Sequence, residues 1–144
     1  MILGIVNDHA GYYLKLKLLE YLKQKNIQFI NFGSDTPDAV DYPDFAHILA
    51  KALENKQVDL GISICGTGNG INIAANKHMG IRSAVCWRKE ISHLARLHND
   101  ANICALPARF ITTEEAYEIM DEFINTSFEG GRHIQRINKI PLQS

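Results

Sequence analysis

Residues 60–70 read LGISICGTGNG, and this stretch decides the fold. Its first part, Leu60–Ile64, is a short apolar run of the kind that forms a strand buried on both faces. Cys65 ends that run, and three glycines then alternate with polar residues up to Gly70. A helical segment is expected from about Gly70 to Lys77. A buried strand that passes through a glycine-rich loop into a helix predicts an α/β protein.

Similar apolar runs recur along the chain, with longer amphipathic segments between them. Strands that alternate with helices predict a parallel sheet, because the right-handed crossovers place helices on both of its faces. We therefore predict an α/β fold, a three-layer α/β/α sandwich with a five-stranded parallel, Rossmann-like sheet and a C-terminal helix, in a single domain over residues 1–144. The expected strands are Ile2–Val6, Phe29–Phe32, Leu60–Ile64, Arg82–Cys86 and Ile103–Leu106.

Six segments show helical spacing or helix-start signals. Pro43 marks the first turn of a helix that opens at Asp41, and Ile48 is among its residues expected to face the core. Thr112 followed by Glu115 is a capping-box signature. The expected helices are Tyr12–Lys25, residues 41–53, Gly70–Lys77, Lys89–Leu97, residues 112–124 and Arg132–Ile140.

The composition excludes several classes of protein. The 144 residues are 46% apolar and carry a formal net charge of −1, so no general basic field favours nucleic acid or an anionic membrane. No apolar run approaches the roughly 20 residues of a spanning helix. The chain starts directly in a strand-like run without a signal-peptide pattern, which predicts a cytoplasmic protein. Three cysteines without CxxC spacing favour reduced thiols, no metal site and no cofactor.

Reactive side chains follow the predicted strands, where ligands bind in open parallel sheets. One group is Asn7–Gly11 after the first strand, and a second is Cys65–Gly70 after the third. We expect His98–Asn102, which precedes the fifth strand, to join them. The glycine-rich loop leads into a helix N-terminus, so its amides predict an anion-binding site.

Three kinds of protein could use such a loop. A dinucleotide-binding module needs a third glycine where Ile71 stands, and needs the loop after the first strand. A cysteine phosphatase needs an arginine at the same position, whereas a Cys65–His98 pair could serve acyl transfer. Proton transfer on a small phosphorylated sugar fits better. Cys65 before a helix N-terminus is placed to act as a thiolate base, and Thr67 with the loop amides can stabilise an enediolate.

A phosphate group also requires positive charge. Arg132 and Arg136 are four residues apart and share one helix face, with His133 beside them. Guanidinium groups match phosphate oxygens in geometry. Arg109 and His9 could complete the shell. Cys86 and Cys104 are expected to be packing residues, His47 and His93 structural, and His78 a solvated turn residue.

The motifs together resemble ribose-5-phosphate isomerase B, of the RpiB/LacAB sugar-phosphate isomerase family. Five motifs carry the resemblance, in family order and over nearly the whole chain. They are NDHAG near the start, DYPDFA, ICGTGNGINIAANKHMGIRSAVCW, RLHNDANICALPARF and FEGGRHIQRI. The resemblance implies an enzyme that interconverts ribose 5-phosphate and ribulose 5-phosphate through a cis-enediol in the pentose phosphate pathway, without a metal. It also implies a homodimer or homotetramer with active sites at the subunit interface.

The resemblance assigns roles to individual residues. Cys65 would move the proton between C2 and C1, and His98, assisted by Asp8, would open the sugar ring. His98, Asn99 and Arg109 would come from the partner chain. Stabilisation of the enediolate falls to Thr67 and the amides of Gly66, Gly68, Asn69 and Gly70. Sugar hydroxyls or the phosphate would be bound by Asn99, His9, Arg109, Arg132 and Arg136, and Tyr42 could line the pocket.

Two features leave the substrate open. Asn7 stands where the family commonly has Cys or Ser. Related isomerases act on allose 6-phosphate or galactose 6-phosphate, although the subunits of the galactose enzyme lack either the loop cysteine or the His-Asn-Asp run that this chain has at residues 98–100. A nucleotide-binding module without turnover is the remaining alternative.

Overall fold

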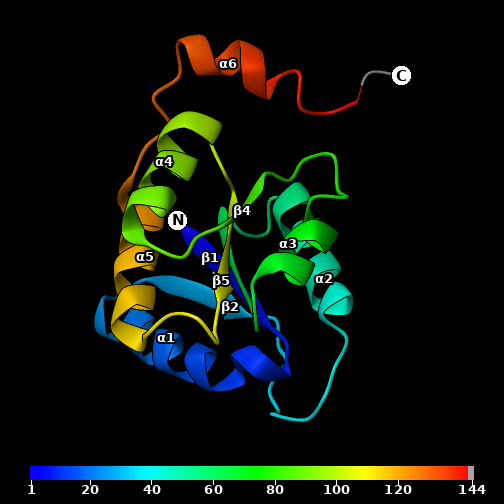
Figure 1. The fold of residues 1–144 in the computed structure, drawn as a ribbon, viewed down its shortest axis with the longest axis vertical. Helices are drawn as coiled ribbons and strands as arrows, with labels where there is room; N and C mark the ends of the chain where they lie inside the picture. Colours follow the sequence, from blue (N-terminus) through cyan, green and yellow to red (C-terminus); the bar gives the residue numbers. More distant parts are fainter. Residues whose placement is uncertain (143–144) are drawn as a thin grey trace.

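The computed structural model describes residues 1–142, and its centre is a parallel sheet of five strands (Figure 1). The strand order is β2-β1-β3-β5-β4, and every neighbouring pair is parallel. The predicted class of fold and all five predicted strands are therefore confirmed. The strands are β1 (Ile2–Asn7), β2 (Gln28–Asn31), β3 (Leu60–Cys65), β4 (Ser83–Val85) and β5 (Ile103–Pro107).

Helices cover both faces of the sheet, which gives the predicted three layers (Figure 1). The face with α1, α4 and α5 and the face with α2 and α3 each bury a separate apolar cluster. The bounds differ from the expected ones by a few residues, and a short 3-10 helix over His9–Gly11 was not predicted. The α-helices are α1 (Tyr12–Gln24), α2 (Tyr42–Glu54), α3 (Asn69–Ala75), α4 (Lys89–Asn99), α5 (Thr113–Asn125) and α6 (Arg132–Ile137).

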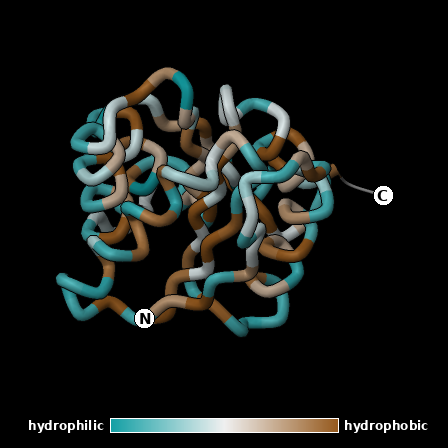
Figure 2. Tube along the Cα trace, turned by 90° about the horizontal axis from the view of Figure 1, so that it is seen from below, coloured by the Kyte–Doolittle hydropathy of each residue, from teal (hydrophilic) through white to brown (hydrophobic). Residues whose placement is uncertain are grey.

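Side-chain alternation along β3 links the two cores. Ile62 and Ile64 belong to the cluster under α1, α4 and α5, whereas Cys65 belongs to the cluster under α2 and α3. This follows from the two-residue period of a strand, whose successive side chains point to opposite faces. Figure 2 shows the result as hydrophobic segments gathered in the middle of the molecule. Cys65 is therefore directed towards the helix that its own loop begins.

Local signals explain where individual helices start. The capping box of α5 is present: Thr112 Oγ1 accepts from the Glu115 amide (3.1 Å), and the Glu115 carboxylate accepts from the Thr112 amide (3.0 Å). Such a cap contributes about 1 kcal/mol. The expectation for Ile48 was wrong, because this side chain is 42% exposed on α2. Helical spacing places Ile48 beside the buried stripe of α2, not within it.

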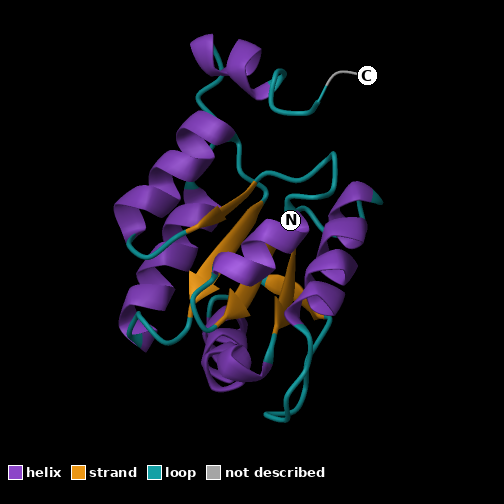
Figure 3. Ribbon diagram, turned by 45° about the vertical axis from the view of Figure 1, so that its right-hand side comes forward, coloured by secondary structure: helices purple, strands orange, loops and turns teal. Residues whose placement is uncertain are grey.

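The last helix lies away from the sheet. In Figure 3 the arrowheads of the strands point away from α6, which lies beyond the amino ends of the strands. It ends at Ile137, three residues before the expected end at Ile140. Among the described residues, no helix is long and apolar enough to cross a membrane.

Candidate functional site

Cys65 and the glycine-rich loop lie at the carboxyl end of β3, next to the end of β5. The backbone of Gly68 has a φ of 76°, and a Cβ there would come within 3.3 Å of the β5 backbone. Only glycine accepts both conditions without strain. The Cys65 side chain is 5% exposed, just beneath this loop. The loop thus passes over the end of the sheet close to the thiol.

Hydrogen bonds fix the loop to the segment that follows β5. The carbonyl of Cys65 accepts from the Ala108 amide (2.9 Å), and the carbonyl of Gly66 accepts from the Arg109 amide (3.0 Å). A Cβ on Gly66 would lie 3.0 Å from Nη1 of Arg109, so the guanidinium covers this glycine. The resemblance implied that Arg109 comes from a partner chain. Instead, it lies beside Cys65 of its own chain, because β3 and β5 are neighbours in the sheet.

Thr67 and Asn69 occupy the exposed outer side of the loop. Thr67 Oγ1 accepts a hydrogen bond from the Asn69 amide (3.2 Å). The hydroxyl proton of Thr67 therefore remains available for an acceptor outside the chain. On the other side of the loop, a Cβ on Gly70 would be 2.6 Å from the ring of Tyr42. Tyr42 thus lies against the loop, which is the position that a residue lining the sugar pocket would need.

Asp8 and His9 reach the same edge from β1. The Asp8 amide donates to the Ile64 carbonyl (3.0 Å), which fixes the end of β1 against β3. The Asp8 carboxylate accepts from the Gly11 amide (3.2 Å) and caps the short 3-10 helix. His9 Nδ1 accepts from the Val40 amide (3.3 Å), so its Nε2 is the nitrogen left for a ligand. We call the residues assembled here the Cys65 group; they are Asp8, His9, Tyr42, Cys65–Gly70 and Arg109.

His98 and Asn99 lie at the opposite end of the sheet. They end α4, which runs back from the carboxyl edge, and the Asn102 carbonyl accepts from the Gly61 amide (2.8 Å) at the amino end of β3. Four residue steps separate Gly61 from Cys65, about 13 Å along the strand at about 3.3 Å per residue. The expectation that His98–Asn102 joins the carboxyl edge was therefore wrong, because this segment precedes β5 instead of following it.

The two arginines of α6 lie with His98, not with Cys65. The Glu129 amide donates to the Leu97 carbonyl (3.0 Å), which joins the start of this segment to α4. Both arginine side chains are exposed; Arg132 Nη1 lies 3.6 Å from the Glu129 carboxylate, and Arg136 makes no ion pair within residues 1–142. We call this assembly the His98 group; it comprises His98, Asn99, Glu129, Arg132, His133 and Arg136.

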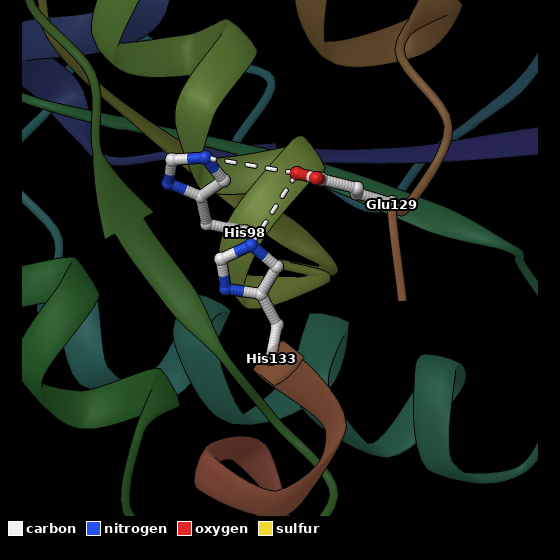
Figure 4. A group of neighbouring side chains, drawn as sticks. All are labelled: His98, Glu129 and His133. Carbon is white, nitrogen blue, oxygen red and sulfur yellow. Dashed lines mark ion pairs between the residues drawn. The ribbon is translucent and has the colours of Figure 1, made fainter. Parts of the chain in front are cut away.

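Figure 4 shows His98 and His133 with Glu129, which was not predicted as a site residue. The Nε2 atoms of the histidines lie 3.9 Å and 3.3 Å from the same oxygen of Glu129, respectively. The sequence signal was weak, since Glu129 and His133 are four residues apart but His98 is on another helix. The cluster forms because α6 packs against the end of α4.

The remaining cysteines have a structural role, as predicted. Cys86 and Cys104 are fully buried in the core under α1, α4 and α5. Burial raises the pKa of the Cys104 thiol well above its usual range, and a hydrogen bond with Cys86 acts in the same direction. A thiol that stays protonated is a poor nucleophile.

His78 does not match its predicted role of a solvated turn residue. Its Nε2 lies 2.7 Å from Nδ1 of His47, and its Nδ1 lies 3.1 Å from the Glu54 carboxylate. The three side chains join α2 to the loop after α3, so His78 is a structural residue of that contact. His47 has the structural role that was expected.

Neither of two surface hollows in the chain is lined by Cys65. One, of about 270 Å³, lies between the loop after α3 and the C-terminal segment around Ile140. The other, of about 290 Å³, is lined by Arg82, Asn99 and Ile140 at the amino edge. The chain therefore offers a thiol, a glycine loop and one arginine at one edge, and histidines with two arginines at the other.

The sequence matches a family model described as Ribose/Galactose Isomerase over residues 3–140. Ribose-5-phosphate isomerase B of Escherichia coli (strain K12) is 41% identical over 133 residues, which are 92% of this chain and 89% of that protein.

Solved structures agree with this match. Ribose-5-phosphate isomerase B of Clostridium thermocellum superposes with a TM-score of 0.96 at 46% identity, over 97% of this chain and 95% of that one. That of Mycoplasma genitalium, with bound ribulose-5-phosphate, gives 0.91 at 44% identity over 96% and 93%. The chain therefore belongs to the ribose/galactose isomerase family and is an aldose–ketose isomerase.

Proposed function

We propose that the chain interconverts D-ribose 5-phosphate and D-ribulose 5-phosphate through a cis-enediolate, with Cys65 as the acid–base residue and no metal. The observation that carries the proposal is the position of Cys65 at the end of β3, directly beneath a glycine loop with an outward hydroxyl at Thr67. An isomerase of this kind needs a base beside donors for an oxyanion, and this loop supplies both.

The reaction follows from these parts. The Cys65 thiolate removes the proton from C2 of the open-chain aldose, and the electron pair of that bond forms the C1–C2 double bond of the enediolate. Thr67 and the loop amides donate hydrogen bonds to the negative oxygen. The proton of the C2 hydroxyl passes to the neighbouring O1 of the enediolate, and the thiol then returns its proton to C1 as the C2–O bond becomes the ketone. One residue serves as base and then as acid, so no other proton carrier is needed at carbon.

Ring opening requires a second acid–base group, and we assign it to His98 with Asp8 assisting. The Asp8 carboxylate is fixed at the carboxyl edge by its bond to the Gly11 amide, whereas His98 lies at the other edge. Within one copy of the chain, Asp8 and His98 therefore do not meet at a single site. We infer that two copies pair so that the His98 group of one meets the Cys65 group of the other.

The same pairing accounts for the phosphate. Arg136 and Arg132 would bind it from one copy, together with His9 and Arg109 of the other. Asn99 would hold sugar hydroxyls, and Tyr42 would line the pocket beside Gly70. Each chain of a two-fold dimer gives one group and receives the other, so two equivalent sites form. A homotetramer of two such dimers satisfies the same requirement.

Two observations support a pentose phosphate as the substrate. The Mycoplasma genitalium relative was solved with ribulose-5-phosphate, and this chain has both the loop cysteine and His98-Asn99-Asp100. The alternative is a six-carbon sugar phosphate, allose 6-phosphate or galactose 6-phosphate, which needs the same proton transfer in a longer pocket.

An isomerase assay tests the proposal. Purified protein is given ribose 5-phosphate, allose 6-phosphate and galactose 6-phosphate in parallel, and the ketose is measured. We expect the highest kcat/KM for ribose 5-phosphate. A higher value for either hexose phosphate would move the assignment to that sugar, and no turnover together with measurable NAD(P) binding would favour a nucleotide-binding module.

A further inference from the structure

Glu129 lies beside two stacked histidines, and one ring nitrogen of each faces its carboxylate (Figure 4). His98 comes from the end of α4 and His133 from the first turn of α6, and their rings stack with centroids 4.5 Å apart and planes 19° from parallel. Both Nε2 atoms face Glu129 (Figure 4), and the partly exposed His98 ring has to turn out of the stack for both lone pairs to meet at one ion. One ligand atom from each of the three residues lies within 4.8 Å of the others.

These separations are close to those of a zinc site. Zinc binds histidine nitrogen and carboxylate oxygen at about 2.0–2.1 Å in tetrahedral geometry, which puts neighbouring ligand atoms roughly 3.3 Å apart. His133 Nε2 is already 3.3 Å from the Glu129 oxygen, and His98 Nε2 is 3.9 Å away. The three ligand atoms lie within 4.8 Å of one another, so a contraction of at most about 1.5 Å, taken up by the partly exposed His98 and Glu129, would complete the set.

The histidine on α6 has an unsatisfied nitrogen. His133 is 7% exposed, and its Nε2 has no hydrogen-bond partner, because the approach to Glu129 lacks hydrogen-bond geometry. A buried polar atom without a partner costs about 1–3 kcal/mol. A bound cation would remove that cost. His98 and Glu129 are 36% and 43% exposed, so an ion could reach the cluster and keep a water as fourth ligand.

We propose that His98, Glu129 and His133 bind a divalent transition-metal ion of the zinc class, with water in the open position. The ion is not a cofactor for the isomerisation. It occupies Nε2 of His98 and blocks that residue reversibly. The predicted inhibition rests on the function proposed for His98, whereas the predicted metal binding rests only on the geometry of the three side chains. Arg132, 3.6 Å from Glu129, competes with the ion for the carboxylate and has to turn away.

The chain contains a second cluster of the same composition that serves as a control. His78 lies between His47 and Glu54 and uses its two nitrogens in opposite directions, at 2.7 Å and 3.1 Å. The three groups are therefore arranged in line and do not converge on one point. If residue composition decided metal binding, both clusters would bind an ion. The geometry predicts binding only at the cluster with Glu129.

Cobalt is the probe, because its visible absorption reports tetrahedral coordination. Untagged, metal-stripped protein is titrated with Co²⁺, and bound Co²⁺ is displaced with Zn²⁺. We expect one ion per chain in the wild type and in His78→Ala. Loss of an outer partner of a metal ligand costs about 10–100-fold in affinity, so loss of a ligand in His133→Ala or Glu129→Gln should cost at least about 100-fold. Equal binding by wild type and His133→Ala, or no binding by the wild type, overturns the proposal.

Isomerase activity separates the two inferences. Saturating Zn²⁺ should lower the wild-type rate, and a chelator should restore it, while the rate of the stripped protein stays at its full value. If Co²⁺ and Zn²⁺ bind at the cluster but the rate is unchanged, the metal site stands and the role of His98 in turnover fails.

Discussion

The Cys65 group and the His98 group differ in what builds them. The first is assembled by the sheet: β1, β3 and β5 end side by side, and backbone hydrogen bonds fix the loop over the thiol. The second is assembled by helix ends, where α6 packs on α4 beyond the amino edge. The first has acid–base and oxyanion groups and one arginine, whereas the second has the ring-opening candidate and two arginines. Neither holds the full set that we propose for a sugar phosphate, and our proposal that copies of the chain combine them rests on this difference.

The largest expected effect is in the Cys65 group. Cys65→Ser replaces the thiol by a hydroxyl of similar size. The much higher pKa of the hydroxyl makes serine a poor base. Losing general acid–base catalysis costs about 10²–10⁴-fold, and we expect a loss of kcat in that range. Cys86→Ala is the control, since the Cys86 side chain is buried in the core on the opposite face of the sheet from Cys65, and its kcat should stay within about threefold of wild type. With circular dichroism showing both variants folded, an unimpaired serine variant would remove Cys65 from the mechanism.

The next effect is in the His98 group. Arg136→Ala removes a charge that has no ion partner within residues 1–142. Hydrogen bonds to charged groups contribute about 1.5–3 kcal/mol, so kcat/KM should fall about 10–150-fold. Part of the phosphate binding energy orients the sugar, so kcat should fall along with a rise in KM.

The matched control is Arg88→Ala, an exposed arginine that pairs with Glu90 at the start of α4. Its kcat/KM should equal that of wild type. Equal kinetics for the Arg88 and Arg136 variants would make α6 an ordinary solvated helix and leave the Cys65 group without its proposed complement.

The smallest effect concerns the stability of the loop beside the Cys65 group. Lys15 is fully buried, and its ammonium donates to Asn31, to the Ser34 carbonyl and to Asp35 at 2.9 Å. The hydrogen bond from Lys15, followed by that from Asn31, lowers the pKa of Asp35 below its usual value. Asp35 is 76% exposed, so the pair should contribute no more than about 1 kcal/mol to the free energy of unfolding.

A lowered pKa fixes the direction of the pH dependence. The contribution of Asp35 is present above the pKa of the unfolded chain, about 3.9, and is lost as the pH falls through the lower folded value. Asp35→Asn should therefore be less stable than wild type at pH 6, and the difference should shrink below about pH 4. Urea unfolding at both pH values measures it. A difference that grows on acidification would contradict the assigned pair.

The fold and the Cys65 group follow from local sequence patterns. Apolar runs locate all five strands, and the topology of a parallel sheet brings the residues after β1, β3 and β5 to one edge. Thr112 and Glu115 even fix a helix start. Predicting that Arg109 lies beside Gly66 would have required only the knowledge that β3 and β5 are neighbours in the sheet. The sequence does not reveal that strand order.

The His98 group lies beyond such reasoning. A residue that precedes a strand was grouped with residues that follow strands, although these lie at opposite edges. The contact of His98 with Glu129 and His133 depends on how α6 packs on α4, and tertiary packing of this kind leaves no periodic signal. Ile48 shows the same limit, because membership of an amphipathic helix does not decide which residues at the border of the stripe are covered.

The central claim is that the two groups meet between chains, and remixing of inactive variants tests it directly. Cys65→Ala and His98→Ala proteins, each nearly inactive, are mixed in equal amounts under conditions that exchange subunits, with a mass tag to confirm exchange. Half of randomly formed dimers are then mixed, and each has one site with both lesions and one intact site. The account predicts recovery of about a quarter of wild-type activity, because half of the dimers have one of two sites intact. No recovery after confirmed exchange would mean that Cys65 and His98 act within one chain, which contradicts the account.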